Sequence, residues 1–188
     1  MKQNVRIIGG QYRGKKISFP DLEGLRPTPN RVKETLFNWL MNDIRDARCL
    51  DAFAGSGGLG FEAYSRGAKR VVLVEAVDKA YKHLQQTAAS FNSGNLLVVH
   101  AKALDYFKKT KEMFDIIFLD PPFANNEYTA CLEVLAHTSV LIKGGLVYLE
   151  SAQKQCVNPE HWQEKKAKQA GQVFYGLYEK ISNSPDCG

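Results

Sequence analysis

A glycine-rich segment is the first part of this 188-residue chain in which residue types and spacing indicate chemistry. It reads Asp51-Ala52-Phe53-Ala54-Gly55-Ser56-Gly57-Gly58-Leu59-Gly60, so that Gly55, Gly57 and Gly60 satisfy the pattern G-x-G-x-x-G. Such glycines permit a tight turn and bring the backbone close to a ligand. Glu75 follows Gly55 by twenty residues, where a carboxylate can accept hydrogen bonds from both hydroxyls of a ribose. The loop and Glu75 together predict a site for a nucleoside-containing cofactor.

Asp51 indicates which kind of cofactor this loop binds. The pyrophosphate of a dinucleotide uses the free amides of a helix N-terminus, and a carboxylate at the start of the loop would repel it. A cofactor with a cationic sulfonium and a free ammonium group would instead be attracted by the same carboxylate. Asp51 therefore favours S-adenosylmethionine over NAD. The alternative is a structural role, in which Asp51 only caps the turn.

A second candidate site is Asp120-Pro121-Pro122-Phe123, directly after the apolar run that ends at Leu119. The two prolines fix the backbone and remove two N–H donors, which leaves carbonyl acceptors. Asp120 and the Pro121 carbonyl can accept both protons of an exocyclic amine while Phe123 stacks on the base, a contact worth roughly 1–3 kcal/mol. This arrangement favours the nucleophilic form of the nitrogen and aligns it with a methyl donor. The alternative is a proline-stiffened loop with a buried Phe123.

The central part of the chain predicts the elements that position these two segments. From Ala47 to Glu150 short apolar runs alternate with amphipathic stretches, and the runs are typical of buried strands because they are β-branched and short. The alternation predicts an α/β fold with a parallel sheet covered on both faces. The expected strands are Cys49–Phe53, Arg70–Glu75, Leu96–His100, Phe114–Leu119 and Gly145–Glu150, with helices at about 58–67, 78–92, 103–111 and 126–138. Both candidate segments then lie at the carboxyl edge of the sheet, where such folds bind ligands.

The N-terminal residues predict a small extension of this fold. Val5–Gly10 and Lys15–Pro20 have the pattern of two short strands joined by a turn, which is a β-hairpin. Pro27 and Pro29 disfavour helix before Asn30, an expected N-cap, and apolar residues at helical spacing then predict a helix over about 30–43.

The net charge of +5 is concentrated in the same N-terminal region. Residues 1–33 contain eight basic and two acidic side chains, a sum of +6, and the remaining 155 residues therefore sum to −1. The basic residues are Lys2, Arg6, Arg13, Lys15, Lys16, Arg26, Arg31 and Lys33. A near-neutral body with one basic end suggests contact with a polyanion such as a nucleic acid. A solvated basic arm without a partner is the alternative.

The length predicts one domain over residues 1–181, because 188 residues can bury one sizeable core and are too few for two. We expect a basic hairpin at 1–25, a linker and helix at 26–45, a Rossmann-like body at 46–181 closed by an antiparallel hairpin of Trp162–Lys168 and Gln172–Ile181, and a disordered tail at 182–188. The chain has no apolar run of membrane-spanning length and no apolar block at its start, which favours a cytoplasmic protein. Its four cysteines and four histidines lack metal-site spacing, so no metal is expected.

The combination of motifs resembles the bacterial RsmD methyltransferases over about residues 4–181. The residues that carry the resemblance are Arg26-Pro27-Thr28, Arg31-Val32-Lys33-Glu34-Thr35-Leu36-Phe37-Asn38-Trp39-Leu40, the Asp51–Gly60 loop and Asp120–Phe123. The family implies a class I S-adenosylmethionine-dependent fold with a seven-stranded, mostly parallel sheet. It also implies methylation of N2 of one guanine in 16S rRNA, within the assembled small ribosomal subunit and without another obligate protein partner.

The resemblance also implies roles for particular residues. The cofactor would be held by Asp51, Phe53, Ala54, Gly55, Ser56, Gly57, Gly60, Glu75, Ala76, Ala103 and Asp120, the guanine by Asp120, Pro121, Pro122 and Phe123, and the rRNA by Arg6, Arg13, Lys15, Lys16, Arg26, Thr28 and Arg31. The chain departs from the family at Lys102, where relatives usually have an Asp or Asn that reaches the adenine. A lysine cannot accept that hydrogen bond, so Lys102 is left out of the expected cofactor site.

Three other functions are weighed against this one. An adenine-N6 or other exocyclic-amine methyltransferase of DNA would use the same loop, but DNA enzymes usually need a further domain to recognise sequence. A non-catalytic RNA-binding module is disfavoured because both the cofactor loop and the amine-binding loop are intact. An NAD dehydrogenase is disfavoured by Asp51 and by the absence of a catalytic His, Lys and Tyr set near the edge of the sheet.

Overall fold

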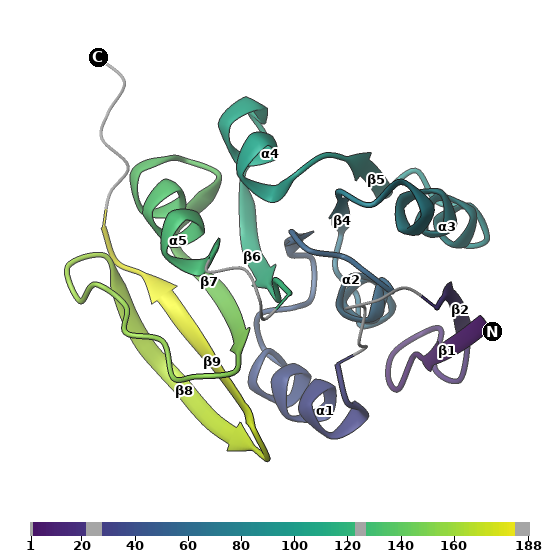
Figure 1. Cartoon of the computed structure of the whole chain (residues 1–188), viewed down its shortest axis with the longest axis horizontal. Helices are drawn as coiled ribbons and strands as arrows, with labels where there is room; N and C mark the ends of the chain where they lie inside the picture. The colour runs from purple at the N-terminus through teal and green to yellow at the C-terminus, as the bar shows by residue number, and fades with distance from the viewer. Residues whose placement is uncertain (1, 22–27, 123–126, 183–188) are drawn as a thin grey trace.

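The central element of the structure, a computed structural model that describes residues 2–21, 28–122 and 127–182, is a seven-stranded sheet (Figure 1). Its strands lie in the spatial order β5 (Leu96–His100), β4 (Arg70–Glu75), β3 (Arg48–Asp51), β6 (Phe114–Leu119), β7 (Leu141–Ser151), β9 (Val173–Lys180) and β8 (Trp162–Ala170). The first five are parallel, and β9 is antiparallel to both β7 and β8. The predicted parallel sheet and its closing hairpin are confirmed.

Helices cover both faces of this sheet (Figure 1). One face is covered by α1 (Asn30–Trp39), α2 (Gly58–Ser65) and α3 (Asp78–Ala89), and the other by α4 (Ala103–Lys109) and α5 (Glu127–His137). Alternate strand residues point to opposite faces, so Leu73 and Phe118 belong to one apolar cluster whereas Val72 and Ile117 belong to the other. These two cores hold the strands at fixed positions and therefore fix the loops at their carboxyl ends.

The N-terminal hairpin forms a separate two-stranded sheet of β1 (Lys2–Arg6) and β2 (Lys16–Pro20). The hairpin was predicted, but its first strand was expected at Val5–Gly10 and ends four residues earlier. The physical reason is a competing acceptor: the backbone amides of Ile8 and Gly9 donate to the carboxylate of Glu62, each at 2.9 Å. These two residues therefore leave the strand and attach the hairpin to α2.

Helix α1 also corrects the sequence-based expectation. It begins at Asn30 with Pro29 as its N-cap, so Asn30 is the first helical residue and not the cap, and no side chain caps the helix. It ends at Trp39 and not near residue 43 because Leu40 and the residues after it form turns. Val32, Leu36 and Phe37 are buried as the helical spacing predicted.

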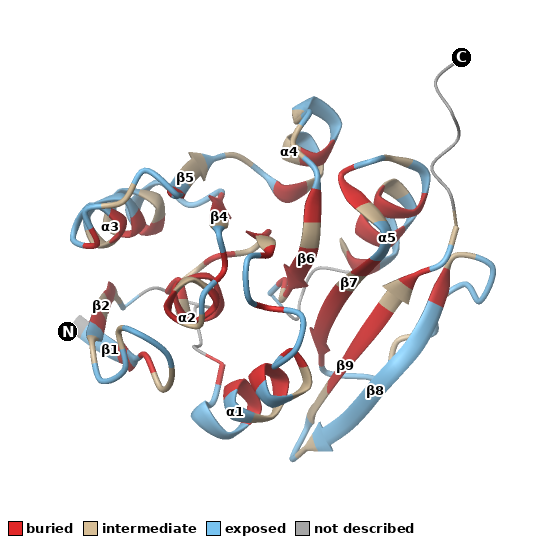
Figure 2. Ribbon diagram, turned by 180° about the vertical axis from the view of Figure 1, so that it is seen from behind, coloured by how far each residue is buried: buried red, intermediate tan, exposed pale blue. Residues whose placement is uncertain are grey.

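Strand β8 lies at the outer edge of the sheet, and its residues 163–169 are exposed (Figure 2). Of the predicted tail, residues 183–188 lie outside the described residues. In the described ranges, none of the helices has the length and apolar character needed to cross a bilayer.

Candidate active site

Four acidic residues lie at the carboxyl ends of four neighbouring strands. Glu75 ends β4, Asp51 ends β3, Asp120 directly follows β6, and Glu150 lies near the end of β7. The register pairs Asp51 with Phe118 and Leu119 with Leu149, so Asp120 and Glu150 are the next pair along β6 and β7. All four side chains therefore belong to the sheet face that α1, α2 and α3 cover, and we call them the carboxylate row.

The glycine loop between β3 and α2 uses positive φ angles at Gly55 (50°) and Gly57 (77°). A Cβ atom at Gly57 would lie 2.3 Å from the ring of Phe61, so a larger residue cannot occupy this position without displacing α2. Glu75 fixes the loop from the neighbouring strand, because its two oxygens accept hydrogen bonds from the amides of Gly55 (2.8 Å) and Val77 (2.7 Å). Each oxygen keeps a second lone pair, so the carboxylate can still accept from a ribose.

Asp51 is buried beneath this loop with an exposed fraction of 2%. Its carboxylate accepts a hydrogen bond from the Gly60 amide at 2.9 Å, where the glycine lets α2 approach β4 closely. Burial is the main cause that raises the pKa of Asp51 to about 7, and the nearby Glu75 carboxylate raises it further. The site thus holds an acid in a place that disfavours its negative charge.

Asp120 has a hydrogen-bonded neighbour from the segment before α1. The Thr28 hydroxyl donates to an oxygen of Asp120 at 3.4 Å, and it also contacts the Glu150 side chain. Burial and the adjacent Glu150 carboxylate raise the pKa of Asp120 well above its usual range. The pKa of Glu150 is likewise raised by burial, because this residue is only 4% exposed.

Among the described residues, no lysine, arginine or histidine forms an ion pair with a member of the carboxylate row. Buried charges in proteins are normally paired or neutralised. A row of buried acids without cations therefore fits a ligand that is itself cationic, and it disfavours a dinucleotide with a pyrophosphate. This chemistry matches the expectation drawn from Asp51 and extends it to the neighbouring strands.

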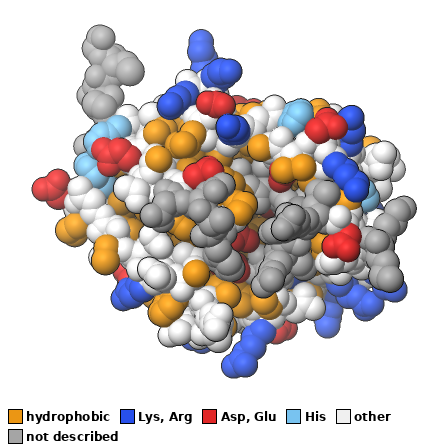
Figure 3. All heavy atoms as spheres, in the orientation of Figure 1, with side chains coloured by type: hydrophobic (Ala, Val, Ile, Leu, Met, Phe, Trp, Pro, Cys, Tyr) orange, Lys and Arg blue, Asp and Glu red, His pale blue; other side chains and the backbone are white. Residues whose placement is uncertain are grey.

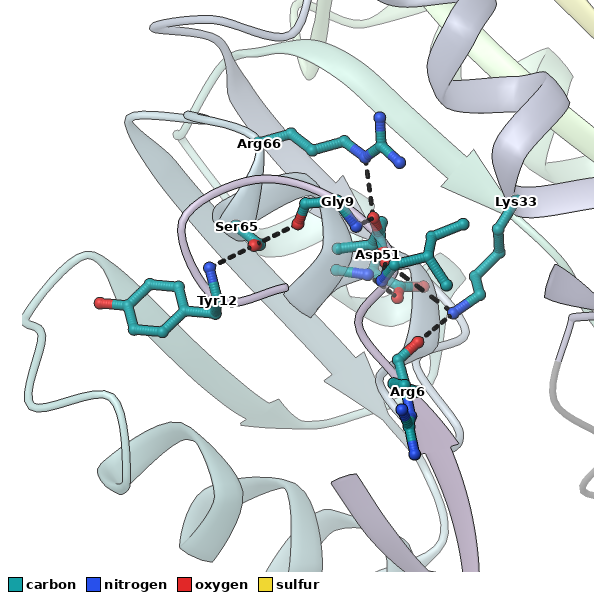
Figure 4. A network of polar contacts seen from close by, with 10 residues as sticks. Arg6, Gly9, Tyr12, Lys33, Asp51, Ser65 and Arg66 are labelled. Atoms are coloured by element: carbon teal, nitrogen blue, oxygen red, sulfur yellow. Dashed lines mark hydrogen bonds and ion pairs between the residues drawn. The ribbon is translucent and has the colours of Figure 1, made fainter. Parts of the chain in front are cut away.

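A different buried charge cluster surrounds Glu62 on α2, and Figure 4 shows it together with Asp51, which the Gly60 amide of the same helix contacts. Glu62 accepts hydrogen bonds from the Ile8 and Gly9 amides and from Arg66 Nε at 2.8 Å. The ammonium group of Lys33 on α1 lies 3.8 Å from Glu62 and donates to the Arg6 carbonyl at 2.8 Å. This Glu62 cluster connects the hairpin, α1 and the helix that follows the glycine loop.

The predicted RNA-binding side chains are distributed over the hairpin and α1. Arg6, Arg13, Lys16 and Arg31 are exposed, and Figure 3 shows Lys and Arg side chains at the margin of the face drawn there, including the edge at which the hairpin lies. Lys15 is instead half-buried, and its ammonium group donates to the Ser90 carbonyl at 3.2 Å and lies 4.1 Å from the centre of the Phe91 ring. This lysine therefore attaches the hairpin to the end of α3.

Comparison with known proteins identifies the family. A family model described as "Conserved hypothetical protein 95" matches residues 5–179. "Ribosomal RNA small subunit methyltransferase D" of Escherichia coli strain K12 is 42% identical over 178 residues, which cover 94% of this chain and 90% of that protein. This chain belongs to the RsmD family. The protein of the same name from Haemophilus influenzae is 43% identical over 185 residues, which cover 95% of each chain.

The fold of this RsmD-family chain agrees with that assignment. The solved structure titled as a putative methyltransferase from Escherichia coli superposes with a TM-score of 0.87 at 41% identity and covers 96% of this chain and all of that one. A more distant solved structure, "M.jannaschii tRNA m1G37 methyltransferase", shares the fold with a TM-score of 0.67 at 10% identity and covers 90% of this chain and 55% of that one. The architecture is therefore that of a class I S-adenosylmethionine-dependent methyltransferase, as expected.

The remaining predicted site residues of the RsmD-family chain differ in how far they are buried, and some are not described by the structure. Phe123 and Arg26 fall outside the described residues. In the glycine loop, Phe53 and Gly55 are half-buried, and Ala54 and Ser56 are buried. After β6, Pro121 is buried and Pro122 is exposed. Ala76 is exposed after β4, and Ala103 is the buried first residue of α4. Lys102 is exposed directly before α4. Thr28, expected to contact RNA, is buried against Asp120.

Sequence reasoning missed one acid of the carboxylate row, Glu150, and one structural acid beside it, Glu62. Glu150 was treated only as the end of a strand, and Glu62 only as part of an amphipathic helix. A sequence signal existed for Glu150, because the neighbouring strands also end at acids, namely Asp51, Glu75 and Asp120. No comparable signal existed for Glu62, whose partners Ile8 and Gly9 are more than fifty residues away.

Proposed function

We propose that this chain transfers a methyl group from S-adenosylmethionine to N2 of a guanine in 16S rRNA. The observation that carries the proposal is the carboxylate row, whose acids lie side by side next to the glycine loop without a basic partner among the described residues. The names of the similar proteins support ribosomal RNA of the small subunit as the substrate. The choice of guanine N2, and of position 966 in that rRNA, follows from the family resemblance.

The residues present fit such a cofactor. Glu75, which already orients the loop amide of Gly55, has free lone pairs for the ribose, and Asp51 offers a buried carboxylate to a positive group. The remaining loop residues Phe53, Ala54, Ser56, Gly57 and Gly60, with Ala76 and Ala103, would enclose it. When bound, S-adenosylmethionine supplies an electrophilic methyl group. No metal is part of the proposal.

The target base would be held by Asp120 and the loop after it. Asp120 and the Pro121 carbonyl accept the two hydrogens of the exocyclic amine, which increases the electron density at the nitrogen and directs it toward the methyl donor. Phe123 would stack on the base, and Pro122 stiffens the loop between them. The same carboxylate is the nearest acceptor for the proton that the nitrogen must lose after methylation.

The exposed basic residues would bind the rRNA backbone. Arg6, Arg13, Lys16 and Arg31, together with Lys15 and Arg26, belong to or follow the hairpin, and their positive charge would attract folded RNA of the assembled subunit. Thr28, expected from the sequence to contact RNA, is uncharged and buried, so it is not part of this surface. The proposal includes a cytoplasmic location, where the subunit is found, and action without another obligate protein partner.

Methyl mapping tests the reaction directly. Small subunits that lack the modification are incubated with the protein and S-adenosylmethionine, and the methyl groups on 16S rRNA are located by mass spectrometry, with protein-free rRNA as a parallel substrate. One new methyl group on a guanine N2 is expected, with more product from subunits than from free rRNA. A methyl group on adenine N6, or on DNA only, would contradict the proposal. Calorimetry with S-adenosylmethionine and NAD tests the cofactor, and tight binding of NAD alone would exclude it.

Charge reversal tests the hairpin. Arg13→Glu and Lys16→Glu should weaken binding to the subunit and lower the salt dependence of binding by about one counterion for each lost phosphate contact. Lys143→Glu is a matched control, because Lys143 is an exposed lysine on β7, a strand that does not pair with the hairpin. Lys15 is left unchanged because its ammonium group has the structural contacts described above. A salt dependence equal to that of the unaltered protein would show that the hairpin does not bind RNA.

A further inference from the structure

Glu150 is a buried acid that the proposed reaction does not yet use. It lies on β7 beside Asp120 on β6, and both side chains are on the same face of the sheet. Tyr148 donates its hydroxyl to Glu150 Oε2 at 2.9 Å, and the Tyr128 hydroxyl donates to the Glu150 backbone carbonyl. Glu150 is therefore held firmly at the position next to the carboxylate that is proposed to bind the amine.

Thr28 connects the two acids. Its hydroxyl is 3.4 Å from Asp120 Oδ2 and is also hydrogen-bonded with the side chain of Glu150. A hydroxyl group has one proton, so it can donate to one carboxylate only. If both acids were ionised, the Thr28 hydroxyl could donate to one of them, and its oxygen would face a carboxylate oxygen of the other with no proton between the two atoms. A continuous hydrogen-bond chain, Glu150–Thr28–Asp120, forms when one acid is protonated and donates to the Thr28 oxygen, while the Thr28 hydroxyl donates to the other acid.

Electrostatics also favours a single proton on this pair. Two neighbouring carboxylates in a buried site do not both ionise readily, because each negative charge disfavours the other. The other titratable groups that face the pair are Asp51, Tyr128 and Tyr148, so no cation among the described residues offsets the repulsion. Glu150 is almost completely buried, whereas Asp120 is partly exposed and can receive an amine. This difference in exposure favours the proton on Glu150, whereas the hydrogen bond that Glu150 accepts from Tyr148 favours its ionised form, so the location of the proton is what the experiments below decide.

We propose that Glu150 is a positioning residue that carries the one proton of the Glu150–Thr28–Asp120 chain and so keeps Asp120 ionised and oriented as the acceptor for the target amine. The inference rests on the proposed methyl transfer. It adds a residue that contacts neither cofactor nor base and acts through Thr28. It also gives the segment before α1, which carries Thr28, a role in the reaction.

Isosteric amides report which acid carries the proton. Glu150→Gln resembles a protonated glutamic acid because its NH2 group can donate to Thr28, so kcat should fall by no more than a few fold. Asp120→Asn places a donor where the amine needs an acceptor, so kcat should fall by about 100-fold or more. The affinity for S-adenosylmethionine, measured by calorimetry, should change little in both variants. This difference between the two amides is the expected result.

The other outcomes separate this inference from the proposed function. Activity in Asp120→Asn with loss in Glu150→Gln would place the proton on Asp120 and overturn the inference. Loss in both variants, with cofactor binding intact, would mean that two negative charges are needed and would also overturn it. Activity in both would remove Asp120 from its role and contradict the proposed function, as would an unaltered protein that methylates no RNA.

Variants of Thr28 provide a second test that does not alter a carboxylate. Thr28→Val keeps the volume but removes the hydroxyl, so kcat should fall about tenfold, which corresponds to about 1.4 kcal/mol, with little change in the KM for S-adenosylmethionine. Thr28→Ser restores the hydroxyl and should recover most of the loss. A kcat in Thr28→Val equal to that of the unaltered protein would show that the reaction does not depend on the hydrogen-bond chain through Thr28.

Infrared spectroscopy detects the proton itself. The unaltered protein at neutral pH should show the C=O stretching band of a protonated carboxylic acid that is missing from Glu150→Gln. Asp51 contributes to both spectra, so its band cancels in the difference between them. A difference spectrum with only a carboxylate band would mean that Glu150 is ionised and would overturn the inference.

Discussion

Two groups of buried charges contact α2, and they differ in whether their charges are balanced. In the Glu62 cluster, a carboxylate with an exposed fraction of 0% accepts from two backbone amides and Arg66 and lies beside the ammonium group of Lys33. In the carboxylate row, Asp51, Asp120 and Glu150 are close to one another, and no ion pair balances them within the described residues. The charges of the Glu62 cluster are balanced without a ligand, whereas those of the carboxylate row are not.

This difference separates a structural role from a functional one. A buried ion is costly unless hydrogen bonds and an opposite charge compensate for the loss of water. Glu62 has that compensation, and its partners come from three segments that it holds together. Asp51, Asp120 and Glu150 instead have raised pKa values, which are frequent at functional sites.

The largest effect is expected for Glu62→Ala. The substitution leaves Lys33 buried without its counter-charge and removes the acceptor of two amides, so the free energy of unfolding should fall by about 3–5 kcal/mol. Denaturant titration measures the change. The double variant Lys33→Met with Glu62→Leu is the control, because it removes both charges and should recover part of the loss. A decrease below about 1 kcal/mol for Glu62→Ala would contradict the structural role.

Asp51→Asn should have the opposite effect on stability. The folded protein keeps a proton on Asp51 up to a pH of about 7, whereas the unfolded chain loses it near 3.8. Between these values the folded state binds more protons, so the free energy of unfolding of the unaltered protein decreases as the pH rises from about 4 to about 7. Asparagine does not titrate. The variant should therefore be more stable at pH 8 by an amount on the order of 4 kcal/mol, and the difference should disappear near pH 4.

Thermal or denaturant unfolding at several pH values measures this difference. Asp115→Asn is a useful control because the Asp115 carboxylate is bound to Arg48, which lowers its pKa. Its stability difference should have the opposite sign at neutral pH. An Asp51→Asn variant that is less stable at pH 8 would show that Asp51 is compensated in the folded protein after all.

The same variant should bind S-adenosylmethionine more weakly. Asp51→Asn removes the negative charge that is proposed to attract a cationic group, so the dissociation constant should rise about tenfold, or about 1.4 kcal/mol. Isothermal calorimetry measures the change. Binding of S-adenosylhomocysteine, which has no sulfonium charge, is the matched comparison and should respond less if the sulfonium is the group attracted. Equal affinities of variant and unaltered protein for S-adenosylmethionine would remove Asp51 from the cofactor site.

The smallest effect is expected for a charge pair that is neither buried nor unbalanced. Arg70 at the start of β4 donates two hydrogen bonds to Glu112, at 2.7 and 2.9 Å, and both side chains are partly exposed. Glu112→Gln should lower the free energy of unfolding by about 0.2–1 kcal/mol without changing cofactor affinity. A larger loss, or a change in affinity, would mean that exposure is a poor guide to the cost of a charge in this protein.

The sequence predicted most of the fold because its signals are local. Strand β4 (Arg70–Glu75) and strand β6 (Phe114–Leu119) were predicted with the observed bounds because each is a buried aliphatic run that a polar residue ends. The end of the first hairpin strand was not predictable, because it depends on an acceptor on α2. Sequence periodicity reports what a residue's neighbours along the chain prefer, and it contains nothing about Glu62 binding Ile8 and Gly9.

The part of the candidate site that lies in a local motif was also predictable from the sequence. Asp51, the glycines and Glu75 form a motif with fixed spacing, so their approach in space could be expected. Thr28 and Glu150 meet at Asp120 from segments that are more than a hundred residues apart. Their contact depends on strand register and on the path of the chain before α1. The proximity of Asp120 and Glu150, and with it the question of which of them is protonated, is therefore visible only in the structure.

The exposed edge strand β8 has a consequence for how the protein behaves in solution. An unpaired edge offers free backbone groups to a strand from another copy, which is a route to aggregation. Lys165, Lys166 and Lys168 lie along the exposed part of β8, and natural sheets commonly use lysines in such places to prevent this pairing. Within the described residues the sheet therefore ends in an open edge that no helix covers, and replacing these lysines with valine or threonine would convert that edge into a template for self-association.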